Sequence, residues 1–90
     1  ALHQNYPNPF NPSTQISFDI PEGSEVVTLN IYNILGKKVS TLLNNVMKPG
    51  KHKVEWNAID SDGNPVASGI YFYELNTPSF IARKKMLLIR

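Results

Sequence analysis

The chain has 90 residues, no cysteine and a formal net charge of +2 at pH 7. This length fits a single domain, and the lack of cysteine excludes disulfide bonds, thiolate chemistry and cysteine-ligated metals. Four of the nine basic residues lie between positions 83 and 90, so five bases against seven acids leave the rest of the chain at five minus seven, or −2. A nucleic-acid-binding face is therefore not indicated, and no segment approaches the ~20 apolar residues of a membrane span.

Residues 1–13, here called the leader, are rich in proline and asparagine. Pro7, Pro9 and Pro12 each fix φ near about −65° and favour extended conformations in the residues before them, which excludes a helix. The leader is therefore expected to be a stiff, extended segment. We expect the rings of Tyr6 and Phe10 to pack against the domain that follows.

Residues 14–90 show short runs of alternating apolar and polar residues, separated by turn signals at 21–24, 33–36, 49–50 and 59–69. The runs cover residues 14–20, 26–34, 39–43, 51–58, 70–75 and 80–90. This pattern predicts an all-β fold, an immunoglobulin-like (Ig-like) antiparallel β-sandwich of about seven short strands. The inner faces are expected to hold Ile16, Phe18 and Ile20, then Val27, Leu29 and Ile31. The next strand is expected to begin with Val39, Thr41 and Leu43.

Trp56 is the single tryptophan and lies in an apolar, alternating run. Such a residue is more often a core anchor than a ligand platform, so we expect it to be buried between the sheets. Its expected neighbours are Val54, Leu29 and Phe72. A carbohydrate-binding face would need several exposed aromatic residues in a row, and Tyr71 and Tyr73 are the pair that could begin one.

The sequence carries no recognisable catalytic or metal-binding motif. His3 and His52 are far apart in sequence, and no serine lies in a Gly-x-Ser-x-Gly turn. The stretch 60–64 begins like a calcium-binding EF-hand loop, but Pro65 and Tyr71 occupy the positions that require glycine and glutamate. Residues 62–63 are better interpreted as a hairpin turn, with adventitious weak calcium binding as the minor alternative. We therefore expect no enzymatic activity, no cofactor and no metal.

Four phrases carry a family resemblance: "NYPNPFNP" at residues 5–12, "YNILGKKV" at 32–39, "PVASGIY" at 65–71 and "KKMLLIR" at 84–90. Together, from Asn5 to Arg90, they resemble the type A C-terminal sorting domain of proteins exported by type IX secretion. The middle of the chain is also similar to the Ig-like domain of the flagellar hook-capping protein. That relative lacks the "NYPNPFNP" opening, so the opening favours the sorting domain.

The resemblance implies a leader at 1–13 and a sandwich sorting domain at 14–90, together forming the C-terminal piece of a larger protein. In that family the domain folds in the periplasm and directs its N-terminal cargo to the cell surface or the medium. The implied partners are the outer-membrane secretion machinery and a sortase-like surface protease, and the sequence leaves open whether the domain is removed. The alternative is a structural Ig-like accessory module, a spacer or polysaccharide-binding unit of a secreted hydrolase.

The resemblance also suggests which residues the secretion machinery reads. The final strand, Lys84 to Arg90, is the predicted signal and has apolar residues on both faces. The alternative interpretation of its basic residues is that they only keep an ordinary last strand soluble. Gly69 and Tyr71 are expected to hold the strand that pairs with it. The full predicted recognition set is Gly36, Gly69, Tyr71, Lys84, Lys85, Met86, Leu87, Leu88, Ile89 and Arg90, with the leader motif Asn5, Tyr6, Pro7, Asn8, Pro9, Phe10, Asn11 and Pro12.

Overall fold

The computed structural model describes residues 1–23 and 25–90, and these residues form six β-strands. The strands are β1 (Thr14–Ile20), β2 (Glu25–Asn33), β3 (Lys38–Met47), β4 (Gly50–Trp56), β5 (Gly69–Asn76) and β6 (Ile81–Leu88). The predicted turn at 21–24 includes Ser24, which lies outside the described residues. No helix among the described residues has the length and apolarity that crossing a membrane requires.

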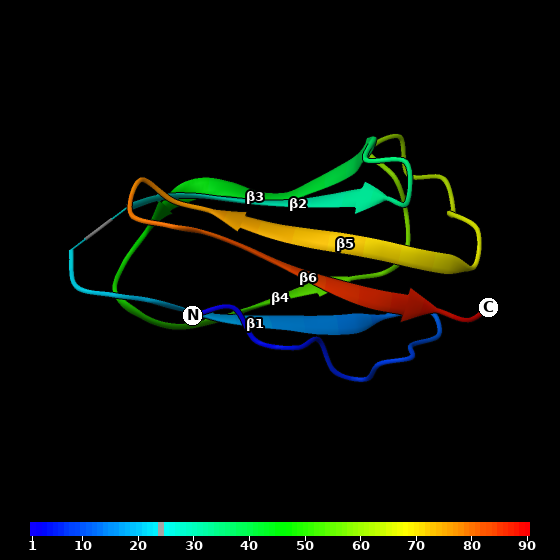
Figure 1. Cartoon of the computed structure of the whole chain (residues 1–90), viewed down its shortest axis with the longest axis horizontal. Helices are drawn as coiled ribbons and strands as arrows, with labels where there is room; N and C mark the ends of the chain where they lie inside the picture. Colours follow the sequence, from blue (N-terminus) through cyan, green and yellow to red (C-terminus); the bar gives the residue numbers. More distant parts are fainter. Residues whose placement is uncertain (24) are drawn as a thin grey trace.

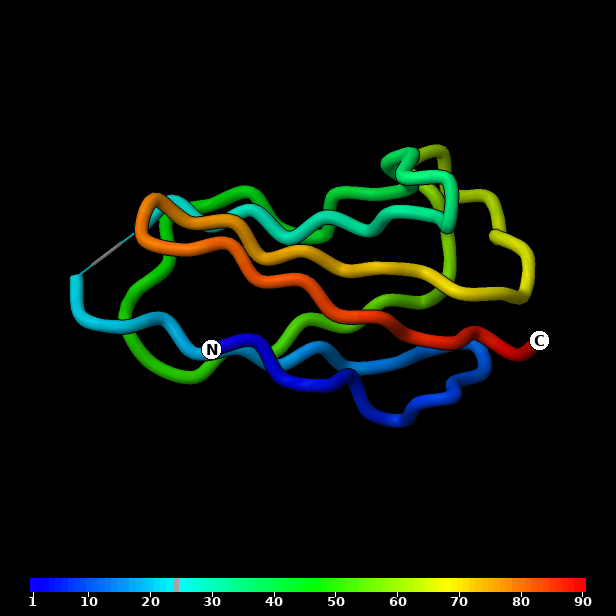
Figure 2. Tube along the Cα trace, in the orientation of Figure 1, coloured from blue at the N-terminus to red at the C-terminus, as the bar shows by residue number. Residues whose placement is uncertain are grey.

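The strands form two antiparallel sheets that face each other (Figure 1). One sheet pairs β1 with β4, and the other has the order β3-β2-β5-β6. The trace in Figure 2 shows the leader running beside β1, close to β6. The predicted all-β, Ig-like antiparallel sandwich is confirmed, with six strands rather than about seven. The leader adds isolated bridges to it.

The core lies between the sheets and is built by alternation along each strand. The inward side chains of β1 and β2 are those predicted, because period-2 alternation fixes which residues share a face. The buried apolar side chains of the strands are Ile16, Phe18, Ile20, Val27, Leu29, Ile31, Trp56, Tyr71, Tyr73, Leu75, Met86 and Leu88. Since Tyr71 and Tyr73 are buried, they cannot form the exposed sugar-binding pair that the sequence allowed.

Strand β3 departs from simple alternation because two bulges interrupt its pairing with β2. Leu29 pairs with Leu43 and Asn30 with Thr41, so Leu42 is passed over. A second shift lies between Ile31 and Tyr32. An extra residue in one strand reverses the facing of those beyond it. Ser40 is consequently buried and Thr41 exposed.

Trp56 is buried, with 1% of its surface exposed, which confirms the predicted core role. Its ring centroid lies 5.8 Å from that of Phe10 and 5.4 Å from that of Tyr71. The indole Nε1 donates a hydrogen bond of 2.9 Å to the carbonyl of Ile59. Phe72 was predicted as a neighbour, but it alternates with Tyr71 and Tyr73 and faces away from the core. The aromatic partners therefore come from the leader and from the opposite face of β5.

Candidate functional site

The candidate site is the seam between the leader and β6, where the predicted recognition residues gather. On one side the leader pairs with β1: Tyr6 and Gln15 exchange backbone hydrogen bonds of 3.0 and 2.9 Å, and the N–H of His3 donates to the carbonyl of Ser17 at 3.0 Å. Isolated antiparallel bridges join Leu2 to Phe18 and Tyr6 to Gln15. The leader thus extends the two-stranded sheet.

On its other side the leader pairs with β6. The N–H of Phe10 donates to the carbonyl of Leu87, and the N–H of Ile89 donates to the carbonyl of Phe10, both at 3.0 Å. The Asn8 side chain accepts from the N–H of Leu87 at 3.0 Å, and Gln4 donates to the carbonyl of Lys85 at 2.8 Å. The leader therefore joins the two sheets and covers the edge of β6 from residue 85 to 89.

A buried polar cluster holds the start of the leader in place. The Tyr73 hydroxyl accepts from the N–H of Asn5 at 2.8 Å and donates to the carbonyl of His3 at 2.7 Å. The Asn5 amide donates to the Thr14 hydroxyl at 2.9 Å, and that hydroxyl donates to the carbonyl of Pro7 at 2.9 Å. Burial raises the pKa of Tyr73 to about 12, which the hydrogen bond from Asn5 partly opposes. The phenol is thus a neutral anchor at ordinary pH.

The rings of Phe10 and Tyr6 in the leader differ in burial. Phe10 is 2% exposed and packs against Trp56, as predicted. Tyr6 is 80% exposed, so the prediction that its ring packs on the sandwich is wrong. The reason is geometric: the backbone of Tyr6 pairs with Gln15, an exposed residue of β1, and its side chain shares that outward direction. The remaining leader-motif residues outside Asn5 are exposed: Pro7, Asn8, Pro9, Asn11 and Pro12.

The final strand is covered on one face only. Met86 and Leu88 are each 1% exposed, whereas Leu87 is 37% exposed and Ile89 is 50% exposed. The strand begins at Ile81 and ends at Leu88, earlier at both ends than the predicted 84–90. A strand that closes a two-layer sandwich has solvent on its outer face, so its apolar residues cannot be covered on both sides.

The two central lysines of β6 lie on opposite faces of the strand. Lys84 is half-buried, and Lys85 is exposed on the opposite face of the strand. They pair with Tyr73 and Phe72 of β5, respectively. Lys84 is therefore not a freely solvated charge, whereas Lys85 is. Substitutions at Lys84 and Lys85 will therefore have different consequences for folding.

Arg90 is tied to the loop before β5. Its N–H donates to the Ser68 hydroxyl at 2.9 Å, its Nε donates to the carbonyl of Val66 at 2.6 Å, and its Nη2 donates to the carbonyl of Ala58 at 2.7 Å. The carbonyl of Ala67, in the same loop, accepts a hydrogen bond of 2.6 Å from the Tyr71 hydroxyl of β5. Burial raises the pKa of Tyr71, and the charge of Arg90 opposes that shift.

The structure brings most, but not all, of the predicted recognition residues together. Gly69 pairs with Leu88 and Tyr71 pairs with Met86, so β5 is the strand that holds β6. Gly36 lies instead in the turn after β2. In the sheet, β5 lies between β2 and β6, so Gly36 is not beside the final strand. Its φ of +82° favours glycine, so its place is explained by the turn. The sequence offered no signal for the contacts of Arg90, which span 22 to 32 positions.

The two histidines share an open groove beside β1 and β4, although they are distant in sequence. The groove has a volume of about 480 Å³ and is lined by His3, Ser17, Phe18, Asp19, Lys51, His52 and Lys53. His3 Nε2 lies 2.6 Å from a carboxylate oxygen of Asp19, and this hydrogen bond holds the pKa of Asp19 below its ordinary value. Among the described residues no three acidic or histidine side chains are placed to hold a metal ion.

The fold and the leader-closed seam define a small Ig-like β-sandwich module. Residues 5–79 match the FlgD Ig-like domain family, so the chain belongs to that family. The predicted relation to the flagellar hook-capping domain is thereby confirmed. No curated protein matches the chain closely enough to count as a relative.

Three solved structures are similar over most of the chain. One is PorZ, described as an essential surface component of the type-IX secretion system of Porphyromonas gingivalis. The TM-score is 0.69 and the sequence identity 25%, and the match covers 99% of this chain and 11% of PorZ. The second is dimeric latent PorU from the same organism: TM-score 0.76, 22% identity, 98% of this chain and 9% of PorU. The third is FlgD from P. aeruginosa: TM-score 0.67, 20% identity, 86% of this chain and 67% of FlgD. The chain spans about a tenth of PorZ and PorU, and the likenesses to PorU and FlgD concern the fold alone.

Proposed function

We propose that the chain is a non-catalytic sorting domain of type IX secretion, which directs attached N-terminal cargo through the periplasm to the cell surface or the medium. The observation that carries the proposal is the likeness to PorZ, in which 99% of this chain aligns with 11% of a type IX secretion component at 25% identity. The "NYPNPFNP" leader motif supports the same conclusion. The proposed partners are the outer-membrane secretion machinery and a sortase-like surface protease.

We propose that the secretion machinery recognises the part of the β6 edge that the leader does not engage. Backbone groups of every second residue in a strand point to the same edge. The leader engages this edge at Lys85, Leu87 and Ile89, so the N–H and C=O of Arg83 point to the same side. An edge of this kind can accept a strand from another protein, with side chains supplying specificity. Arg83 and Lys85 are the exposed basic residues of β6.

A fusion experiment tests the sorting role directly. Residues 1–90 are attached behind a reporter that is exported to the periplasm, in a bacterium with type IX secretion and in an otherwise identical strain lacking it. Surface reporter in the first strain alone supports the proposal. Periplasmic retention in both strains contradicts it and favours a structural accessory module, for which membership of the FlgD Ig-like family is the supporting observation.

A charge reversal tests the proposed role of β6. Lys85→Glu is preferable to removal of residues 86–90, because that truncation also removes Met86 and Leu88 from the core. Lys51→Glu is the matched control, since it makes the same charge change at an exposed position of β4. We expect Lys85→Glu to reduce surface delivery and Lys51→Glu to leave it unchanged. Equal delivery of both variants and the wild type would show that Lys85 is not part of the signal.

A further inference from the structure

A row of two aromatic residues between two lysines crosses the outer face of the four-stranded sheet. Tyr32 of β2 pairs with Lys38 of β3 and with Phe72 of β5, and Phe72 pairs with Lys85 of β6. The two lysines are exposed and the two rings are half-buried. We call Lys38, Tyr32, Phe72 and Lys85 the aromatic row. Its members are brought together only by the strand order.

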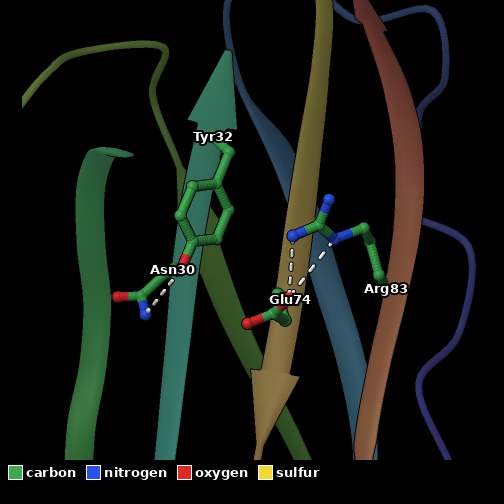
Figure 3. Close-up of polar contacts among 4 residues, drawn as sticks. All are labelled: Asn30, Tyr32, Glu74 and Arg83. Carbon is green, nitrogen blue, oxygen red and sulfur yellow. Dashed lines mark hydrogen bonds and ion pairs between the residues drawn. The ribbon is translucent and has the colours of Figure 1, made fainter. Parts of the chain in front are cut away.

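The Tyr32 ring is held in position by neighbouring polar groups. The Thr41 hydroxyl donates to Asn30 Oδ1 at 2.7 Å, and Asn30 Nδ2 donates to the Tyr32 hydroxyl at 3.4 Å. The guanidinium carbon of Arg83 lies 5.3 Å from the centroid of Tyr32 and 5.8 Å from that of Phe72. In Figure 3 the Tyr32 ring lies broadside on the outer side of the sheet, with Arg83 beside it. The guanidinium therefore lies over part of both rings, and the remaining exposed ring surface of Tyr32 and Phe72 faces outward.

A second row of polar residues lies beside the aromatic row. Asn30 pairs with Thr41 of β3 and Glu74 of β5, and Glu74 pairs with Arg83 of β6. Arg83 donates to one oxygen of Glu74, Oε2, at 3.3 Å from Nε and 2.9 Å from Nη2 (Figure 3). The carboxylate, amide and hydroxyl of this row provide hydrogen-bond acceptors next to the rings. Ligands that carry hydroxyl donors suit such a surface.

We propose that this face binds an acidic polysaccharide. Sugar rings have an apolar face that can lie over an aromatic ring, and their hydroxyls can donate to Glu74 and Asn30. Carboxylates along such a chain would pair with Lys38 and Lys85, the two ends of the aromatic row. With Arg83 included, three cations and one carboxylate line the face, so its charge complements an anionic chain.

The same groups argue against two other occupants. A DNA backbone has no hydroxyl donor for the Glu74 carboxylate, whereas the sugars of a polysaccharide carry several. The buried centre of a protein interface is enriched in aromatic residues and arginine but depleted of lysine and glutamate. Here Glu74, Lys38 and Lys85 lie next to the rings. A hydroxyl-rich anionic chain satisfies the aromatic, acceptor and cationic groups together.

The test measures binding of the 90-residue chain to polygalacturonate, with dextran as the neutral polymer, by isothermal titration calorimetry at about 0.15 M salt. The double variant Lys38→Gln/Lys85→Gln should weaken binding about tenfold or more, since each lysine forms a charge-assisted contact. Lys51→Gln/Lys53→Gln is the control, because it removes the same charge from exposed positions of β4. The control should bind as the wild type does.

Tyr32→Leu separates ring recognition from simple charge attraction. It keeps every charge, so loss of polygalacturonate binding with an unchanged melting temperature supports the proposal. The proposal is overturned if the wild type does not bind polygalacturonate or binds dextran equally well. Equal loss in both lysine pairs would indicate general charge attraction. Tighter binding of a single-stranded DNA oligonucleotide through Lys38 and Lys85 would assign the face to nucleic acid instead.

Discussion

Replacing Phe10 by alanine tests whether the leader is part of the folded core. The ring is 2% exposed and packs on Trp56. Burying an aromatic side chain removes about 150–250 Å² from water, which at about 25 cal/mol per Å² corresponds to roughly 4–6 kcal/mol. Phenylalanine-to-alanine changes in cores cost about 3–5 kcal/mol. A domain of this size has a total free energy of unfolding of roughly 5–13 kcal/mol, so Phe10→Ala should remove a large part of it.

Urea unfolding followed by Trp56 fluorescence measures this loss, because the indole is buried in the native state. Tyr6→Ala is the matched control: it removes a ring from the same leader, but that ring is 80% exposed, so the change should stay within about 0.5 kcal/mol. If Phe10→Ala is unfolded outright, Phe10→Leu should still fold, with a loss of about 1–2 kcal/mol. Equal unfolding midpoints for the Phe10 and Tyr6 variants would refute the reasoning and make the leader a tether.

Three further predictions concern the polar contacts. The raised pKa of Tyr73, about 12, means that its phenol ionises first in the unfolded chain, so its contribution to stability is present below about pH 10 and is lost as the pH rises towards 12. The stability difference between wild type and Tyr73→Phe, measured by denaturant titration, should shrink across that range; a constant difference would contradict it. The pKa of Asp19, followed by NMR, should lie below 3.8 and should rise in His3→Ala; no change in the variant would show that the hydrogen bond is absent in solution. Arg90→Ala should speed amide hydrogen exchange at Ile89 and lower the free energy of unfolding by about 1–3 kcal/mol, whereas unchanged exchange would mean that its contacts are not maintained.

The sequence alone was sufficient for the fold class and for much of the core. Alternation with a period of two is a local property, so the inner residues of β1 and β2 and the burial of Trp56 could be predicted from residues close together in the chain. The prolines of the leader likewise excluded a helix by their own geometry. The middle of the chain indicated the relation to the Ig-like domain of the hook-capping protein, and the family match over residues 5–79 agrees with it.

Only the tertiary structure determined which side of each strand faces the core and which distant residues meet. Alternation divides β5 into two sets of residues without saying which set is inside, which is why Phe72 was misplaced as a neighbour of Trp56. The bulges of β3 reverse its facing, and no local signal marks them. The hydrogen bonds of the leader with β6 join residues about 80 positions apart, as in the contact of Asn8 with Leu87. Such pairings depend on how both sheets close around the core, so the seam and the aromatic row could emerge only from the assembled fold.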